Sequence, residues 1–178
     1  MKYDPSKHHR RSIRLKGYEY TQAGAYFVTI CVQGRECVLG EVVGGQMQLN
    51  DWGCVAEECW MWLADQYPYV TLDASVIMPN HLHGIIVVDD GRGGSRTAPT
   101  TRKPLGRLVG AFKTVSTKRI NEMRGTPGAV FWQRNYWEHI IRNDADLARI
   151  REYIQNNPAR WMEDQLHPDA PPNKFNRG

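Results

Sequence analysis

The sequence predicts an α+β domain in which helices pack against a mostly antiparallel sheet. Apolar runs with the two-residue period of strands alternate along the chain with runs of helical period. Gly44-Gly45 joins two short strand patterns as a hairpin turn, which makes those strands antiparallel. The sequence contains no glycine-rich phosphate loop of the dinucleotide-binding or P-loop type, so nothing favours a doubly wound parallel sheet.

The first half of the chain is expected to form a strand, a hairpin and a helix. Residues 26–32 predict a strand, because β-branched and aromatic side chains dominate there. Residues 41–43 and 46–49 flank the glycine pair as the two hairpin strands. Asn50 is a good N-cap for an amphipathic helix that ends near residues 67–68, a Tyr-Pro pair.

The middle of the chain is expected to form two strands, a loop and a basic helix. Residues 72–78 and 81–88 read as strands, and residues 89–101 read as a loop because they are rich in Gly, Ser, Thr and Pro. The basic helix begins near Pro104, since proline is favoured in a first helical turn.

A strand at residues 136–141 precedes the last predicted helix, which begins at about residue 144 and ends at 156 or 157. Asn143 is its N-cap, and Asp144 and Asp146 lie in the first turn, where the helix dipole favours acids. Pro158 cannot continue the helix. Both ends of this helix are therefore well marked.

The pattern His81-Leu82-His83 is the strongest chemical signal in the chain. Successive strand side chains point to opposite faces, so both imidazoles project from one face while Leu82 points away. Neutral imidazole is a common ligand of divalent metals, and a strand holds two such ligands at a set separation. The pair is a candidate metal clamp, although two histidines in a strand are also compatible with ordinary core or surface positions.

Tyr153 and Asn157 form a second pair, four residues apart and hence on the same side of the last helix. They place a phenol hydroxyl and an amide oxygen in one neighbourhood. Two interpretations remain open. The pair is functional, or the tyrosine packs at the edge of the apolar stripe and the asparagine simply ends the helix before a proline.

Three blocks, taken together and in order, carry a family resemblance: residues 78–86 (MPNHLHGII), 131–143 (FWQRNYWEHIIRN) and 152–158 (EYIQNNP). The chain resembles the REP-associated tyrosine transposases, relatives of the single-strand insertion-sequence transposases within the HUH endonuclease class. Residues 24–31 and 105–113 extend the likeness. The resemblance implies a ferredoxin-like or RRM-like palm with the two histidines on a central strand.

The resemblance also implies an enzyme, an HUH single-tyrosine transposase that cleaves and joins DNA strands. Tyr153 would be the nucleophile and would form a covalent 5′-phosphotyrosine. His81, His83 and Asn157 would hold a divalent cation, Mg²⁺ or Mn²⁺. The insertion-sequence relatives commonly have glutamine in place of Asn157, whereas asparagine matches the REP-associated pattern. The substrates would be single-stranded REP-type DNA hairpins.

DNA-binding residues are expected in two basic regions and one aromatic block. Residues 7–16 contain five Lys or Arg and no acid, which predicts a flexible arm. Residues 102–124 contain seven Lys or Arg and the single acid Glu122. Bases stack on aromatic faces, and arginine serves both phosphate and stacking. The expected DNA-binding residues are Arg10, Arg11, Arg14, Lys113, Trp132, Gln133, Arg134 and Trp137.

His139 and Tyr136 are weaker candidates for the chemistry. His139 is a candidate supporting group, although a histidine in a strand is more often structural. Tyr136 is a rival nucleophile, but it lies among aromatic residues and lacks an amide one helical turn away, so Tyr153 is favoured. The sequence does not identify the base that would activate a phenol, whose ordinary pKa is about 10.

Two other function classes fit parts of the pattern. A rolling-circle-type replication initiator nickase also combines the histidine pair with a tyrosine, but such initiators typically carry a lysine shortly after the nucleophile, where this chain has Asn156 and Asn157. A non-catalytic single-stranded nucleic-acid-binding module would need only the stacking aromatics. The complete set of two histidines, Tyr153 and Asn157 favours the enzyme.

Length and composition agree with one globular domain. The chain has 178 residues, 41% hydrophobic and 24% charged, with a net charge of +4. We expect a basic flexible arm at 1–16, one catalytic domain at 17–162 and a Pro-rich tail at 163–178. No apolar stretch approaches the roughly 20 residues that span a bilayer, and the four cysteines form no Cys-x-x-Cys pair. A cytoplasmic protein without a membrane partner is expected, with monomer and homodimer both open.

Overall fold

The fold consists of a four-stranded sheet, a separate hairpin and helices on both faces of the sheet. The computed structural model describes residues 23–89 and 102–171. Its elements, in order, are β1 (Gly24–Cys31), η1 (Gln33–Arg35), β2 (Gly40–Val43), β3 (Gln46–Leu49), α1 (Asp51–Gln66), β4 (Val70–Met78), β5 (His81–Val88), α2 (Leu105–Arg124), β6 (Trp137–Ile141), α3 (Asp144–Asn156) and η2 (Pro158–Glu163).

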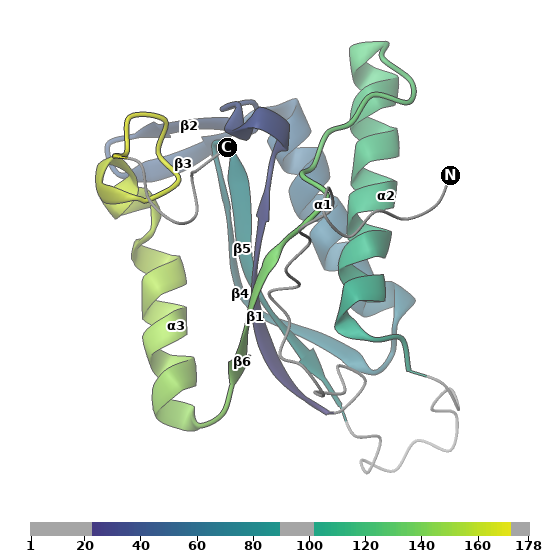
Figure 1. Cartoon of the computed structure of the whole chain (residues 1–178), viewed down its shortest axis with the longest axis vertical. Coiled ribbons are helices and arrows are strands. Elements are labelled where there is room, and N and C mark those ends of the chain that lie inside the picture. Colours follow the sequence, from purple (N-terminus) through teal and green to yellow (C-terminus); the bar gives the residue numbers. More distant parts are fainter. Residues whose placement is uncertain (1–22, 90–101, 172–178) are drawn as a thin grey trace, which may run out of the picture.

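The sheet is antiparallel throughout, in the order β4-β5-β1-β6, and β2 pairs with β3 as the separate hairpin. Apart from the hairpin and α3, the elements follow the β-α-β-β-α-β order of ferredoxin-like folds. Helices α1 and α2 cover one face of the sheet, and α3 lies on the other (Figure 1). The predicted α+β palm, with the histidines on a central strand, is confirmed.

Local signals read from the sequence account for the turns and helix starts. Gly44 and Gly45 have φ of 59° and 77°, the left-handed conformation that a two-residue hairpin turn requires. The Asn50 side chain accepts hydrogen bonds from the backbone at the start of α1, and Asn143 does the same for α3. β4 begins at Val70 rather than at residue 72, because Val70 already pairs with Val88.

Strand β5 divides its side chains between the two faces of the sheet. Leu82 and Ile86 join the large core beneath α1 and α2. Gly84 lies on that same face, and a Cβ atom there would lie 2.3 Å from a Trp60 ring carbon, so the indole needs a glycine beneath it. His81, His83 and Ile85 alternate with these residues and therefore face α3.

Two sequence-level expectations concern the environment of the chain. All four cysteines are free thiols in the structure. Among the residues that the structure describes, no helix combines the length and apolar character needed to cross a membrane. The predicted basic arm at 1–16 lies outside the described residues, as does most of the predicted loop at 89–101.

Candidate active site

His81 and His83 lie side by side at the start of the central strand. Both side chains are buried, and their ring centroids are 4.4 Å apart. On the neighbouring strand β1, Cys31 pairs with His81 and Thr29 pairs with His83. The two-residue period of the strand has therefore brought both imidazoles onto the face that α3 covers.

Each histidine uses one ring nitrogen for a hydrogen bond that orients the ring. His81 Nδ1 donates to Asn80 Oδ1 at 2.7 Å, and a 2.8 Å hydrogen bond joins His83 Nδ1 to the Thr29 hydroxyl. Because an amide oxygen only accepts, His81 carries its proton on Nδ1 and presents a lone pair on Nε2. That Nε2 is buried and has no hydrogen-bond partner. A metal-binding histidine typically has this arrangement, with its other nitrogen held by a neighbour.

Burial keeps both imidazoles neutral. Desolvation lowers the pKa of His81 to about 3. Desolvation and the adjacent His81 hold the pKa of His83 well below its usual value. A neutral imidazole has one free lone pair, which is what a metal ion requires.

Tyr153 projects from α3 toward this pair. Its hydroxyl lies 3.2 Å from His83 Nε2, and its ring packs edge-on against Phe27 and His83. The residue remains 43% exposed, so the hydroxyl sits between the buried cluster and solvent. Partial burial, and then the Asp164 carboxylate, raise the pKa of Tyr153 to about 12. The phenol is therefore protonated at neutral pH.

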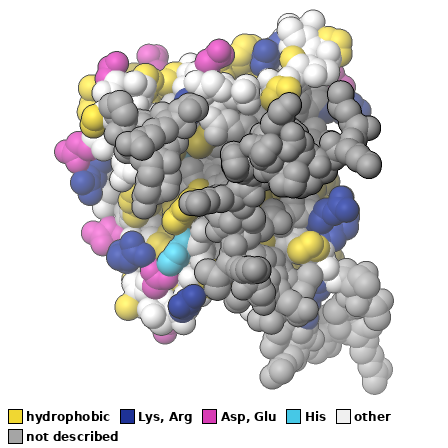
Figure 2. Space-filling view, viewed as in Figure 1, with side chains coloured by type: hydrophobic (Ala, Val, Ile, Leu, Met, Phe, Trp, Pro, Cys, Tyr) yellow, Lys and Arg dark blue, Asp and Glu magenta, His cyan; other side chains and the backbone are white. Residues whose placement is uncertain are grey.

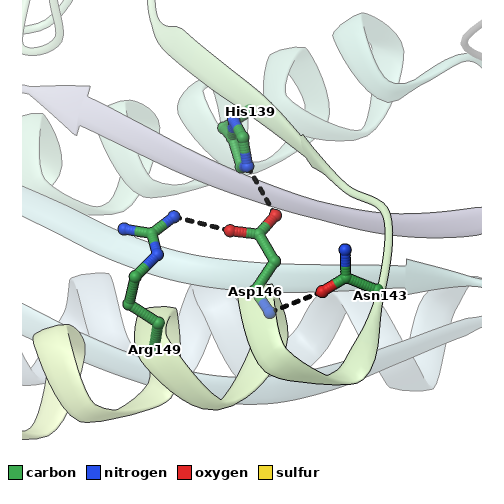
Figure 3. Close-up of polar contacts among 4 residues, drawn as sticks. All are labelled: His139, Asn143, Asp146 and Arg149. Carbon is green, nitrogen blue, oxygen red and sulfur yellow. Dashed lines mark hydrogen bonds and ion pairs between the residues drawn. The ribbon is translucent and has the colours of Figure 1, made fainter.

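Polar contacts hold the start of α3 against the edge of the sheet (Figure 3). Asn143 Oδ1 accepts a 2.8 Å hydrogen bond from the Asp146 backbone. The Asp146 carboxylate accepts from His139 Nε2 at 2.7 Å and from Arg149 at 2.5 Å. His139 lies on β6, so its hydrogen bond to Asp146 links β6 to the helix that carries Tyr153.

A second contact ties α3 to the opposite edge strand. Arg151 donates to both oxygens of Asp73 on β4, at 2.7 and 2.6 Å. The hydrogen bonds from Arg151 lower the pKa of Asp73 below its usual value. Charged side chains of both signs gather along the side of the molecule where α3 lies (Figure 2). Ionic contacts on both flanks thus set the position of α3.

Asn157 and Asp164 complete the polar cluster. Asn157 Nδ2 donates to Asp164 Oδ2 at 3.0 Å, while Asn157 Oδ1 is buried without a partner. A carboxylate oxygen of Asp164 and one nitrogen each of His81 and His83 all lie within 4.8 Å of one another. Imidazole nitrogens with carboxylate and amide oxygens are donors that suit a divalent cation. The two unpartnered buried donors, His81 Nε2 and Asn157 Oδ1, fit such an ion.

The cluster opens into a groove of about 720 Å³ that runs between β6 and α3. His83, Tyr153 and Asp164 line it together with the aromatic side chains of Phe27, Tyr136 and Trp137. A volume of this size is typical of a site for a small molecule or a short stretch of polymer.

Comparison with known proteins shows which proteins the chain resembles. No family model matches the chain. A Haemophilus influenzae protein described only as uncharacterized is 42% identical over 181 residues, which span 94% of this chain and 98% of the relative. A second protein of that organism, provisionally named a REP-associated tyrosine transposase, is 26% identical over 89% of this chain and 84% of the relative.

Among solved structures, a REP-associated tyrosine transposase bound to a REP hairpin has the same fold. Its TM-score is 0.58 at 18% identity, and the match covers 88% of this chain and 77% of that one. The chain is thus similar to REP-associated tyrosine transposases in sequence and in fold. The resemblance first seen in three sequence blocks is thereby confirmed.

Several residues that the sequence singled out for DNA contact have structural partners. Trp132 is only 4% exposed, and its Nε1 donates to the Ser116 hydroxyl at 2.8 Å, so it lies in the core and not on the surface. Lys113 Nζ donates to the backbone carbonyls of Gln133 and Asn135 at 2.8 and 3.0 Å. The ammonium of Lys113 therefore points toward the backbone of residues 133–135, which forms one wall of the groove that contains Tyr153.

The other predicted DNA-binding residues are distributed differently. Trp137 is 36% exposed at the edge strand β6, and both Trp137 and Gln133 line the groove that contains Tyr153. Arg134 is exposed and lines a second groove beside α2. Arg10, Arg11 and Arg14 lie outside the described residues.

Sequence reasoning missed one member of the polar cluster. Asp164 belongs to the segment that was expected to form a tail, yet its neighbours Trp161 and Leu166 are buried. Large apolar residues such as Trp161 and Leu166, on either side of an acid, indicate that a segment packs against the domain. That spacing was the available signal, but it does not indicate against which part of the fold the segment packs.

Proposed function

We propose that this protein is a transposase of the REP-associated tyrosine type, a metal-dependent single-stranded DNA endonuclease and strand transferase that acts on REP-type hairpins through a 5′-phosphotyrosine. One observation carries the proposal: the Tyr153 hydroxyl lies 3.2 Å from His83 Nε2, in the same groove as a cluster of donors suited to a divalent cation. The solved family member, which is bound to a REP hairpin, supports the choice of substrate.

Tyr153 is the proposed nucleophile. Its oxygen attacks the scissile phosphorus, the phenol O–H bond and the P–O3′ bond break, and the departing 3′ oxygen takes up a proton. The products are a 5′-phosphotyrosine and a free 3′-hydroxyl, and the reverse reaction with another 3′-hydroxyl joins two strands. The phosphodiester bond energy is retained in the phosphotyrosine, so strand joining needs no other energy source.

The proposed metal ligands are His81, His83 and Asn157, with Mg²⁺ or Mn²⁺ as the cation. The neutral imidazoles and the unpartnered Asn157 oxygen support this assignment. When bound, such a cation offsets the negative charge of the phosphate and polarises phosphorus toward attack. Asn80 and Thr29 orient the two histidine rings from behind through the hydrogen bonds to Nδ1.

The proposed DNA contacts follow from the groove. Trp137 offers an indole face to a base at the edge of β6, and Gln133 lies along the same wall. Arg134, Arg10, Arg11 and Arg14 are proposed as phosphate contacts. Lys113 is proposed to act mainly through the carbonyls it holds, which shape the wall of the groove.

His139 supports the chemistry only through position, because Asp146 engages its Nε2 at the start of α3. Tyr136, the rival nucleophile, lies beneath the Lys113 ammonium, 5.5 Å from the ring centroid, in a structural contact. We further propose the arm at 1–16 and a cytoplasmic site of action, as a monomer or homodimer. The catalytic domain, expected at 17–162, is proposed to extend past residue 162 to include Asp164 and the buried Leu166.

Replacing Tyr153 with phenylalanine tests the mechanism. Tyr153→Phe removes one hydroxyl and keeps the packed ring, so it should abolish cleavage and the covalent adduct while hairpin affinity stays within a few fold. The assay incubates the full chain with single-stranded REP hairpins and Mg²⁺ or Mn²⁺, then resolves denaturant-stable adducts on a gel.

Tyr136→Phe is the matched control and should still form the adduct. Loss of the adduct in the control, together with its survival in Tyr153→Phe, would reverse the assignment of the nucleophile. Hairpin binding by the unaltered chain without cleavage under any divalent cation would leave a non-catalytic binding module.

A further inference from the structure

We propose that Asp164 is an additional ligand of the same metal ion, and that Asn80 is the positioning residue that brings its segment to the histidines. This inference rests on the proposed metal-dependent function and extends it. Asp164 follows η2, and its carboxylate lies within 4.8 Å of the ligand nitrogens of His81 and His83. The residue is more than eighty positions from the histidines in sequence, so the contact exists only in the folded chain.

The segment that carries Asp164 is held by its neighbours. The Asp164 backbone N–H donates to the Trp161 carbonyl at 3.0 Å, and Asp164 Oδ1 accepts from the Leu166 N–H at 2.6 Å. Leu166 is buried, and the Trp161 ring lies 6.0 Å from that of His81. The turn is packed against the end of the sheet, which holds the carboxylate in a defined place.

Asn80 connects this turn to the first histidine through a single side-chain amide. Its Oδ1 accepts from His81 Nδ1 at 2.7 Å, and its Nδ2 donates to the Leu166 carbonyl at 2.8 Å and to the Arg35 carbonyl at 3.2 Å. Asn80 is fully buried, and its hydrogen bonds with His81 and Leu166 are shielded from water. One amide therefore orients the His81 ring and holds the chain two residues beyond Asp164.

Asn157 performs a comparable task on the other side of the carboxylate. Its Nδ2 donates to Asp164 Oδ2 at 3.0 Å, and its Oδ1 remains buried without a partner. A single amide thus orients the Asp164 carboxylate and leaves its own oxygen available as a donor. The nitrogen and oxygen of Asn157 serve two ligands at once, and neither role excludes the other.

A carboxylate changes which cation the site prefers. Imidazole nitrogens suit zinc, copper and nickel, whereas carboxylate and carbonyl oxygens suit magnesium and manganese. Two histidines with two oxygen donors form a mixed site, in which Asp164 supplies the only formal negative charge among the four side chains. Asp164 should therefore contribute more to the affinity for Mn²⁺ than to the affinity for Zn²⁺.

Metal binding by the full chain without DNA tests the proposal. Mn²⁺ is titrated by calorimetry and by the loss of the paramagnetic signal of free Mn²⁺. Asp164→Asn keeps an oxygen that can accept from Leu166 N–H and removes the charge, so Mn²⁺ affinity should fall at least about tenfold. Zn²⁺ affinity should fall less.

Glu163→Gln is the matched control, because Glu163 is the adjacent acid and its carboxylate pairs with Arg160 at the surface. It should leave Mn²⁺ affinity within about twofold of the unaltered chain. Asn80→Ala should weaken Mn²⁺ binding several-fold, and a circular dichroism spectrum reports whether this variant folds. Asn80→Asp, which keeps the oxygen toward His81, tests the Leu166 contact if the alanine variant does not fold.

The outcomes separate the two proposals. Failure of the unaltered chain to bind Mn²⁺ would overturn the metal-dependent function itself. Binding by the unaltered chain with equal affinity in Asp164→Asn would overturn only the role of Asp164. Unchanged affinity in a folded Asn80 variant would overturn its positioning role.

Discussion

The two faces of the sheet differ in the side chains that they bury. Beneath α1 and α2, alternate residues of β1 and β5 join a large apolar core around Trp60 and Phe112, whose rings meet edge to face. Beneath α3, the apolar cluster is small, with five buried members: Phe27, Ile85, Ile141, Ile150 and Ile154. The space next to that small cluster holds the polar groups His81, His83 and Tyr153.

This difference indicates how a small domain can carry buried polar groups. Burial of two imidazoles costs free energy, which the hydrogen bonds to Asn80 and Thr29 only partly offset. The large core on the opposite face stabilises the same strands by burying apolar surface. Gly84 lies between His83 and Ile85, whose side chains face α3. Because Gly84 has no side chain, the Trp60 ring can pack against the opposite face of β5 at this position.

The largest expected effect is the loss of cleavage on the α3 face. His81→Ala and His83→Ala should each remove cleavage and divalent-ion binding, because each deletes a proposed ligand. Asn157→Ala should weaken metal affinity by roughly tenfold or more. All three variants should stay folded, with a stability loss of about 1–3 kcal/mol from broken buried hydrogen bonds. Full metal-dependent cleavage by a double histidine variant would contradict the assignment.

A substitution on the opposite face should show the reverse pattern. Trp60 is 1% exposed, so Trp60→Ala should lower the free energy of unfolding by about 3–5 kcal/mol. Below its lowered denaturation midpoint, the folded variant should still bind the metal, because Trp60 packs in the core on the opposite face of the sheet from the proposed ligands. Urea denaturation followed by circular dichroism gives the stability, and calorimetry gives the metal affinity. Loss of metal binding in a fully folded Trp60→Ala variant would show that the two faces are not separable.

Lys113 distinguishes a structural cation from a DNA contact at the rim of the groove. Since its ammonium is held by the carbonyls of Gln133 and Asn135, Lys113→Met should weaken hairpin binding without changing its salt dependence. A phosphate contact would instead reduce the slope of log affinity against log salt by about 0.7 for a single strand. Arg134→Met is the matched control, and it should reduce that slope. Binding isotherms at several salt concentrations measure both.

The smallest expected effect concerns the ion pair that ties α3 to β4. Arg151 lowers the pKa of Asp73, so the pair contributes stability above the ordinary carboxyl pKa of 3.8 and loses it as the pH falls through the lowered value. Asp73→Asn should therefore be less stable than the unaltered chain at about pH 5 and nearly equal to it well below pH 3. Urea midpoints at the two pH values measure the difference. A constant difference at both values would mean that the pair does not couple to protonation.

Short-range signals determined much of this protein in advance. The alternation along β5 placed His81 and His83 on one face, and the N-caps Asn50 and Asn143 marked where α1 and α3 begin. These signals succeed because side-chain direction and capping depend on residues only a few positions apart. Tyr153 was likewise placed on the correct helix by its caps and period.

Contacts between distant segments were decided only by the tertiary structure. Three contacts join residues that lie far apart in the chain. Trp132 donates to Ser116 in the core, Lys113 donates to the Gln133 carbonyl, and Asp164 lies next to the two histidines. No periodicity encodes such pairings, because they depend on how the sheet, α3 and the turn after η2 pack in three dimensions. The amide of Asn80 is the clearest case: in the sequence it is one residue before a histidine, and in the fold it also holds the segment that carries Asp164.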